Sequence, residues 1–485
     1  MISKEFCIHG HFYQPPREDP LTGLIPNEPG AAPYLNWNQR IDAECYRTNA
    51  EAGNFEKISF NVGPTLSSWL EFNDSTGYQQ IVNQDRANLA RHGVGNAMAQ
   101  AYNHTILPLA AQMDKVTQVR WGLADFKHRF GHDPQGMWLP ETAVDYPTLE
   151  VLAEHGITYT ILAPWQADDP QVDTSVPYQV KLSHGRHINV FFYDQDLSTR
   201  VSFDPGATSN ADQFLVNYIL PKFNPSAHAD GDAHLVMIAS DGELYGHHQE
   251  FRDKFLKYLL NNSAPGYGIK ITYPGLWLKE HPVTRSVKIR ENTSWSCLHG
   301  VVRWEGNCAC TPGGQWKAYL RQSLNQVGAR LDKVFHDSLR PYLADPWELR
   351  HGYSQVLLGE ARVDEYIRSA VERHLEDGEV NKIALLLKSQ FERQRMFTSC
   401  GWFFDDFDRI EPINNVTHAA QAVWLCHQAA GKNYADDAIQ LLRNVKSRRT
   451  GLRGDLVFYE KYNKAENFRG QASDYLSASN SFSTW

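Results

Sequence analysis

The chain has 485 residues, of which 42% are hydrophobic and 21% are charged, an ordinary balance for a globular protein. That length is too great for one ordinary domain, so we expect two or three domains, with a large barrel among them. The formal net charge of −9 argues against nucleic acid or an anionic membrane as a partner, because both are bound by basic surfaces.

Neither membrane insertion nor export is indicated. No apolar run approaches the roughly 18 residues of a membrane-spanning helix, and the first residues, MISKEFCIHGHFYQPP, lack the apolar core of a signal peptide. The seven cysteines are odd in number and unevenly spread, which does not indicate a disulfide framework. We therefore expect a cytoplasmic protein.

Short β-like runs alternate with helical or irregular stretches over the first 280 residues. The runs are EFCIHGH (5–11), KISFNVG (57–63), GVGNAMAQ (93–100), GMWLP (136–140), ITYTILA (157–163), HINVFFYD (187–194), AHLVMIASD (233–241) and GIKITYP (268–274). Alternation of this kind predicts βαβ units and a parallel sheet, hence an α/β fold. With seven or eight such units, we assign residues 1–285 to a β/α barrel.

The pattern changes after the barrel. Residues 286–314 form a connecting segment with clustered cysteine and histidine. From Gln315 the apolar residues recur with a helical period, as in WKAYLRQSLNQVGARLDKVF, which predicts a C-terminal α-helical domain over residues 315–448. The periodicity then ends, and we expect residues 449–485 to be an irregular tail.

Polar residues close the predicted strands one after another. They are His9, His11, Asn61, Gln100 with His104 shortly after it, Glu141, Asp194 and Asp241. Because the active site of a β/α barrel lies at the carboxyl ends of its strands, this ring fits a catalytic mouth. Strands that simply exit into solvent would explain about half of these residues.

Two strand ends deliver carboxylates. Glu141 follows Trp-Leu-Pro, and Asp241 follows the apolar run VMIAS, with Glu243 two residues further on. A glycosidase needs two such groups, one to attack or stabilise the anomeric carbon and one to protonate the leaving oxygen. The residues alone leave open whether Asp241 or Glu243 is the acid.

The motifs HGHFYQPP, GMWLPETAVD and SDGELYGHH, in this order, resemble the signature regions of glycoside hydrolase family 57. The resemblance implies an incomplete (β/α)7-type barrel followed by helices, and retaining activity on α-glucans of the amylase, 4-α-glucanotransferase or branching type. MFTSCGWFFDD (396–406) resembles a helical region of unassigned function that follows such barrels in one bacterial subgroup.

Carried over to this chain, the resemblance assigns Glu141 as the nucleophile and Asp241 as the acid/base. His11, with Gln14 after it, falls on the family's His-x-x-x-Gln-Pro element and would bind a sugar hydroxyl. Trp138 and His104 are implied as neighbours. Four further residues complete the candidate sugar-binding set. They lie at strand ends, in the motifs or in the aromatic segment after the barrel: His9, Asp194, His247 and Trp295.

The implied reaction proceeds through a covalent glycosyl-enzyme on Glu141 and requires no cofactor. The two carboxyl groups of a retaining enzyme lie about 5–5.5 Å apart. We expect the pKa of Asp241 to be raised by burial or by the charge of Glu141. The partner would be an oligosaccharide or polysaccharide.

Other functions stay open at this point. His-x-His at the end of the first strand, His9 and His11, also suits a metal-dependent hydrolase of the deacetylase or amidohydrolase type. His247, His248, Asp194 and Asp241 could complete such a metal shell. A non-catalytic glucan-binding protein and an exo-glycosidase such as an α-galactosidase are further alternatives.

A separate cluster lies between the predicted domains. Cys297, His299, Cys308 and Cys310 are four soft ligands within 14 residues, which could form a tetrahedral zinc site or hold an iron–sulfur cluster. Their Cys-x-His and Cys-x-Cys spacing differs from the usual Cys-x-x-Cys. The alternative is that they are small buried residues, with Trp295, Arg303 and Trp304 lining a sugar groove.

Overall fold

A computed structural model describes residues 3–223 and 233–467. The chain divides into two compact units. The first contains Met1–Gln14, Asn27–Ala101 and Phe126–Ser296, and the second contains Pro15–Pro26, Tyr102–Asp125 and Cys297–Trp485. No helix in the described part of the chain is long and apolar enough to cross a membrane.

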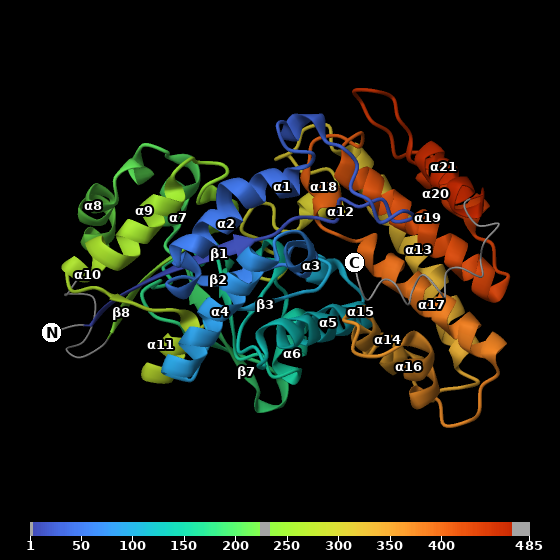
Figure 1. Cartoon of the computed structure of the whole chain (residues 1–485), viewed down its shortest axis with the longest axis horizontal. Coiled ribbons are helices and arrows are strands. Elements are labelled where there is room, and N and C mark those ends of the chain that lie inside the picture. Colours follow the sequence, from blue (N-terminus) through green and yellow to red (C-terminus); the bar gives the residue numbers. More distant parts are fainter. Residues whose placement is uncertain (1–2, 224–232, 468–485) are drawn as a thin grey trace. The chain divides into compact units, whose positions relative to one another are not determined.

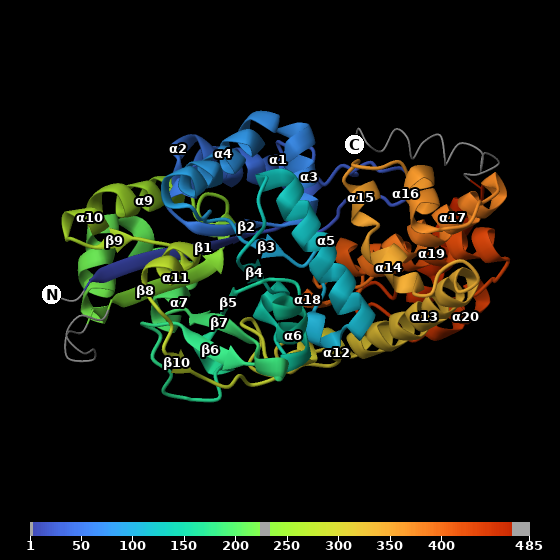
Figure 2. The same cartoon turned by 90° about the horizontal axis from the view of Figure 1, so that it is seen from below.

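Parallel strands form the centre of the first unit (Figures 1 and 2). Hydrogen-bond ladders join β8 to β1, β1 to β2, β3 to β4 and β5 to β7, and single bridges at Phe60–Ala97 and Gly136–Tyr159 connect these pieces. The strand order is therefore β8-β1-β2-β3-β4-β5-β7. The bounds are β1 Lys4–Phe12, β2 Ser59–Val62, β3 Ala99–Gln100, β4 Met137–Trp138, β5 Tyr159–Leu162, β7 His187–Phe192 and β8 His234–Asp241.

The barrel is not closed by a ladder. Within residues 3–223 and 233–467, no strand pairing joins β7 to β8, and one backbone bond of 2.7 Å from Asp194 N to Met237 O links the end of β7 to β8. The remaining strands lie outside this arc: β9 (Lys270–Ile271) pairs with β1, β6 (Tyr178–Lys181) runs antiparallel to β7, and β10 (Arg285–Ser286) pairs with β6. The predicted fold class is confirmed.

The strands are buried because they are apolar on both faces, as parallel strands covered by helices are. Every residue of β1 after Lys4, and every residue of β8 before Asp241, is buried. Helices follow the strands and cover them. Those of the first unit are α1 Trp37–Ile41, α2 Arg47–Ala52, α3 Pro64–Asn73, α4 Ser75–His92, α6 Tyr146–Glu154, α7 Gln195–Phe203, α8 Ala211–Phe214, α9 Arg252–Tyr258, α10 Ala264–Gly266 and α11 Pro274–Glu280.

The second unit is helical, as predicted for residues 315–448. Its helices are α12 Val302–Glu305, α13 Gln315–Leu339, α14 Pro346–His351, α15 Ser354–Leu357, α16 Val363–Ala370, α17 Asp377–Arg395, α18 Cys400–Phe403, α19 Ile410–Ala430, α20 Ala435–Leu442 and α21 Gly454–Asn467. Helix α19 is buried on all sides from Asn415 to Cys426, which makes it the central helix of this unit.

Two expectations about boundaries differ from the structure. Residues 454–467 of the expected irregular tail form helix α21, and residues 468–485 lie outside the described part. Residues 15–26 and 102–125, assigned to the barrel, belong to the second unit, and the latter range includes much of α5 (Gln112–Phe130). The reason for the latter is a buried ionic contact, since Asp114 on α5 pairs with Arg350 at 3.1 Å and with Arg393 at 2.6 Å.

Candidate active site

Polar side chains from three neighbouring strands form one hydrogen-bonded network at their carboxyl ends. The amide of Asn61 on β2 bonds the rings of His9 and His11 on β1, at 3.2 Å to each through Oδ1, and donates to Gln100 Oε1 on β3 at 2.7 Å. His9 also bonds Ser59 Oγ at 2.9 Å. Burial lowers the pKa of His9 to about 3 and of His11 to about 4, so both rings are neutral near pH 7.

Trp138 on β4 packs against this network. Its ring stacks on His9 with centroids 4.6 Å apart and on His11 with centroids 5.0 Å apart. Trp295 meets it edge-on at 5.0 Å, and Tyr193, just after β7, meets Trp295 edge-on at 6.4 Å. The structure thus brings together His9, His11, Trp138 and Trp295, all predicted from sequence.

Glu141 lies in a strained turn directly after β4. Its backbone is left-handed, with φ 57° and ψ 21°, and the next residue, Thr142, has φ 48°. Two successive residues with side chains in this region are unusual, most of all a β-branched threonine. Such strain persists only where the surroundings hold it, and it concentrates at functional sites.

The surroundings of this turn hold it from two directions. The buried side chain of Gln166 accepts a bond from Thr142 Oγ1 and donates to Thr142 O, both at 2.8 Å. On the other side, the chain from residue 292 to 295 pairs antiparallel with residues 141–144, through Val144 N to Thr293 O at 3.1 Å and Trp295 N to Glu141 O at 3.0 Å. The strained conformation is therefore fixed by hydrogen bonds at both edges.

The Glu141 carboxylate is held by two consecutive residues of that paired chain. Ser296 Oγ donates to Glu141 Oε2 at 2.6 Å, and Trp295 Nε1 donates to the same oxygen at 3.1 Å. Sequence reasoning missed Ser296 and Gln166. The only signal for Ser296 was its place beside Trp295.

Asp241 and Glu243 differ in exposure and partners. Asp241 pairs with His11 in the β1–β8 register. It is the solvent-exposed last residue of β8, whose other residues are all buried. Desolvation, followed by the charges of Glu243 and Glu141, raises its pKa to about 8. Glu243 is buried, and its Oε1 accepts bonds from Tyr46 at 2.7 Å and from Tyr13 N at 3.1 Å. Burial raises the pKa of Glu243 to about 7.

Four predicted sugar-binding residues have other surroundings. Gln14 donates to the Tyr46 hydroxyl at 3.2 Å, and this hydroxyl in turn donates to Glu243 Oε1. Asp194 caps the start of α7 by accepting from Leu197 N at 2.9 Å, and it pairs with Lys222 at 3.0 Å. His247 bonds Glu44 Oε2 at 2.5 Å. His104 belongs to the second unit, where it bonds Ser399 Oγ at 2.6 Å.

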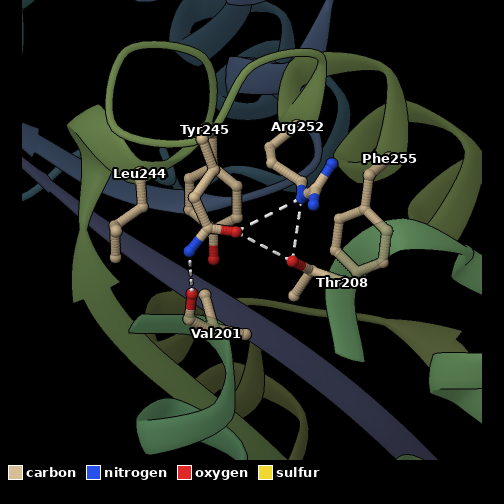
Figure 3. A pocket seen from close by; sticks show the side chains of 7 residues that line it. Val201, Thr208, Leu244, Tyr245, Arg252 and Phe255 are labelled. Atoms are coloured by element: carbon tan, nitrogen blue, oxygen red, sulfur yellow. Dashed lines mark hydrogen bonds between the residues drawn. The ribbon is translucent and has the colours of Figure 1, made fainter. Parts of the chain in front are cut away.

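A pocket elsewhere in the first unit offers no comparable chemistry (Figure 3). It is lined by Val201, Thr208, Leu244, Tyr245, Gln249, Arg252 and Phe255. Its polar groups bond one another: Thr208 Oγ1 donates to Gln249 Oε1 at 2.9 Å, and Arg252 Nε donates to Thr208 Oγ1 at 2.8 Å. This pocket is a packed hydrogen-bonded region rather than a substrate site.

The arrangement does not favour a metal ion at His9 and His11. Both ring nitrogens of His9 bond Ser59 and Asn61, and Nδ1 of His11 bonds Asn61. Among the described residues, neither histidine belongs to a group of His, Cys, Asp and Glu side chains close enough to share an ion.

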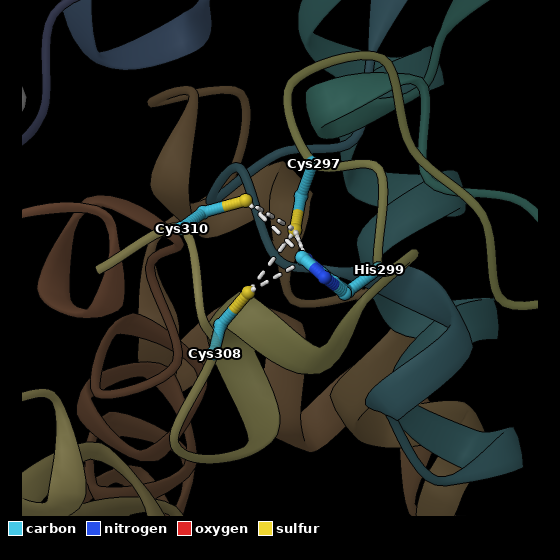
Figure 4. Close-up of side chains that lie close together, drawn as sticks. All are labelled: Cys297, His299, Cys308 and Cys310. Atoms are coloured by element: carbon cyan, nitrogen blue, oxygen red, sulfur yellow. Dashed lines mark hydrogen bonds between the residues drawn. The ribbon is translucent and has the colours of Figure 1, made fainter. Parts of the chain in front are cut away.

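A group of that kind does exist in the second unit. Cys297, His299, Cys308 and Cys310 lie within 4.8 Å of one another and could bind a metal (Figure 4). The alternative that the tryptophans and arginine of this stretch line a sugar groove is wrong for Trp304, which is completely buried. Arg303 stacks on Phe403 of the same unit at 4.7 Å.

Comparisons with known proteins agree with this division. Residues 41–282 match the model of glycosyl hydrolase family 57, and residues 314–471 match a domain of unknown function, DUF3536. Alpha-amylase 1 of Dictyoglomus thermophilum is 24% identical over 192 residues. That match covers 39% of this chain and only 26% of the relative, so the chain spans about a quarter of the curated relative it matches.

Two solved structures share the fold over nearly the whole chain. An exo-type maltose-forming amylase from Pyrococcus sp. ST04 has a TM-score of 0.73 at 15% identity, with 98% of this chain and 94% of that chain covered. A branching enzyme from Pyrococcus horikoshii has a TM-score of 0.62 at 15% identity, with 98% and 96% covered. At these identities the likeness establishes the fold alone.

Proposed function

We propose, on the premise that this chain belongs to glycosyl hydrolase family 57, that it is a retaining glycosidase or transglycosidase acting on α-glucans. The α-glucan class is supported by the relatives, which include an amylase and a branching enzyme. The observation that carries the mechanism is the place of two carboxyl groups at strand ends, Glu141 directly after β4 and Asp241 at the end of β8, where the charge of Glu141 contributes to the raised pKa of Asp241.

In the first step, Glu141 attacks the anomeric carbon and the bond to the leaving sugar breaks. Asp241 donates its proton to the departing oxygen, so the products are a covalent glycosyl-enzyme and a neutral sugar. A carboxyl group with a pKa of about 8 still carries its proton at neutral pH, which suits an acid. The hydrogen bonds from Trp295 and Ser296 to Oε2 fix the orientation of the nucleophile.

In the second step, Asp241, now a carboxylate, removes a proton from water or from an acceptor sugar hydroxyl. The resulting nucleophile displaces Glu141 from the anomeric carbon with net retention. The two carboxyl groups and their hydrogen-bond donors account for both steps, and we propose that no cofactor takes part.

Exposure distinguishes the two candidate acids left open by the sequence. Asp241 is accessible at the end of β8, whereas Glu243 is 6% exposed and bonded to Tyr46 and the Tyr13 amide. A proton donor must reach the leaving oxygen directly. We therefore assign the acid/base role to Asp241, and we assign Glu243 the role of a neighbouring charge.

The sugar would be bound by the groups beside Glu141. Trp295 is half-buried and meets the stacked His11 and Trp138 rings edge-on, and these aromatic groups are suited to packing against a pyranose ring. Trp138 Nε1 and Gln100 Nε2 are buried donors with no hydrogen-bond partner in the described part of the chain. Sugar hydroxyls would satisfy donors of this kind.

The experiment that tests these roles uses α-maltosyl fluoride, whose leaving group needs no protonation. Wild type should turn it over. Asp241→Asn should release one equivalent of fluoride in a burst and then stall, because the first step needs no acid and the second needs the base. Glu141→Gln should release none. The matched control is Glu250→Gln, which changes an exposed carboxylate that follows strand β8, as Asp241 ends it; this variant should behave as wild type.

Products formed from maltoheptaose, amylose and glycogen then identify the reaction, since shorter chains indicate hydrolysis, and longer or newly branched chains indicate transfer. A Glu141→Gln variant that keeps wild-type rates would rule out the nucleophile. A wild type that leaves the fluoride and all three glucans unchanged would rule out the α-glucan class.

A further inference from the structure

The cysteine and histidine cluster of the second unit has the dimensions of a metal site. Cys297 Sγ lies 3.4 Å from Cys308 Sγ and 3.8 Å from Cys310 Sγ. His299 Nδ1 lies 3.9, 3.4 and 3.3 Å from the sulfur atoms of Cys297, Cys308 and Cys310. These five distances are five of the six edges of one small tetrahedron.

The known bond lengths of tetrahedral zinc predict the distances between its ligand atoms. With Zn–S about 2.3 Å and Zn–N about 2.0–2.1 Å, a tetrahedral ion holds two sulfur ligands about 3.8 Å apart and a sulfur and a nitrogen about 3.6 Å apart. All five observed edges fall within about 0.4 Å of those values. We propose that Cys297, His299, Cys308 and Cys310 bind one zinc ion that stabilises residues 297–310.

The other chemistries of such a cluster fit less well. A disulfide needs sulfur atoms about 2.05 Å apart, far closer than the 3.4 Å of Cys297 and Cys308. The ligands of an iron–sulfur cluster are divided among two or more iron atoms, so ligands on different irons are spread more widely than these four. A site closed by four protein ligands is typical of structural zinc rather than catalytic zinc.

The chain presents the ligands from two turns, two ligands per turn (Figure 4). The Gly300 amide bonds Cys297 O, and the Thr311 amide bonds Cys308 O, both at 3.0 Å. In the first turn Leu298, between the two ligands, is 86% exposed while Cys297 is buried. His299 and Cys310, the second ligand of each turn, are exposed, so each turn supplies one buried and one exposed ligand.

A second observation that favours negative charge at the cysteine cluster is the buried ammonium group of Lys317 beside it. Lys317, in the first turn of α13, is fully buried, and its Nζ donates to Thr311 Oγ1 at 3.1 Å. The ammonium is repelled by Arg303 and attracted by Cys308, Asp405 and Cys297. Three thiolates, one neutral imidazole and Zn²⁺ carry a net charge of −1, which would offset Lys317.

The site also bears on catalysis, a step that rests on the proposed function. Cys297 is the next residue in the chain after Ser296, and Trp295 and Ser296 are the donors to Glu141. Fixing Cys297 would limit the freedom of these donors. Loss of the ion should therefore lower kcat more than it changes KM.

The test is metal analysis of the purified full-length chain by mass spectrometry. We expect one zinc per chain in wild type, loss of most of it in Cys308→Ser and His299→Gln, and retention in Cys400→Ser, a control thiol outside the cluster. Replacement of zinc by cobalt in wild type should give the visible spectrum of a tetrahedral cobalt–thiolate site, which does not depend on the variants folding.

Iron with an iron–sulfur absorption spectrum, or no zinc even after incubation of the reduced protein with the ion, would overturn the proposal. So would equal zinc retention in all three variants. Metal content and the cobalt spectrum are read without any glucan, so a failure of the zinc site is distinguishable from a failure of the glycosidase assignment.

Discussion

Ser296 Oγ donates a hydrogen bond of 2.6 Å to Oε2 of Glu141, across 155 positions of the chain. Trp295 donates to the same oxygen, and its backbone amide bonds the Glu141 carbonyl. A single short segment therefore fixes both the backbone and the carboxylate of the proposed nucleophile. Because the turn at Glu141 is strained, this segment and Gln166 together help to keep the carboxylate in one position.

Ser296→Ala should lower kcat by about 10- to 100-fold with little change in KM, because a misplaced reacting group loses rate rather than substrate affinity. Ser296→Thr, which keeps the hydroxyl, should recover most of the activity. The measurement is steady-state kinetics of both variants on maltoheptaose, at a temperature well below the melting temperature of each. Equal losses in the alanine and threonine variants would mean that packing, not the hydrogen bond, is responsible.

The pH profile should report Asp241. Its pKa is raised to about 8, first by burial and then by the charges of Glu243 and Glu141, and the acid works only while protonated. The value of kcat/KM should therefore fall as the pH rises through about 8. Glu243→Gln removes one of the negative charges that raise this pKa, so the falling limb should move to lower pH. A limb that stays in place in Glu243→Gln would show that another group titrates.

The sequence predicted the strands well where they are long and apolar. All eight predicted runs contain a strand, because apolar runs of this kind are buried in a parallel sheet. It missed β6 and β10. Strand β10 has two residues, and β6 alternates buried and exposed residues at the edge of the barrel, so neither produces a long apolar run.

The sequence predicted those residues of the site that lie at the ends of strands. His9 and His11 lie near the end of β1, Trp138 ends β4 and Asp241 ends β8, and barrel geometry brings the carboxyl ends of parallel strands together. Ser296 and Gln166 come from segments outside the barrel strands, and only tertiary pairing with residues 141–144 places them at the site. Asp194 and His247 looked equally suitable in sequence, but a helix cap and a pairing with Glu44 occupy them.

Gln166→Leu tests the support of the strained turn. The change removes the two bonds to Thr142, a bond of 2.9 Å from Ala163 N and a bond of 3.2 Å to Thr293 Oγ1, and buried groups left unpaired cost about 1–3 kcal/mol each. We expect a lower melting temperature together with a lower kcat.

Gln249→Leu is the matched control for this change. Gln249 is also buried and bonds Thr208 and the Val201 carbonyl, but its partners do not include the Glu141 turn. It should lose stability while keeping kcat. If both leucine variants lose kcat in proportion to their stability, the role of Gln166 is structural only.

Glu243 should make stability depend on pH. Burial raises its pKa from 4.5 to about 7, so the folded state binds more protons than the unfolded state between these values. Stability then falls as the pH rises from about 4.5 to 7, by about 3 kcal/mol at most, and the loss persists above pH 7. Glu243→Gln cannot ionise, so it should be more stable than wild type at pH 8 and lose this advantage at pH 4.5. Urea unfolding at the two pH values measures the difference. An advantage of equal size at both would mean that the glutamine improves packing or hydrogen bonding with Tyr46 instead.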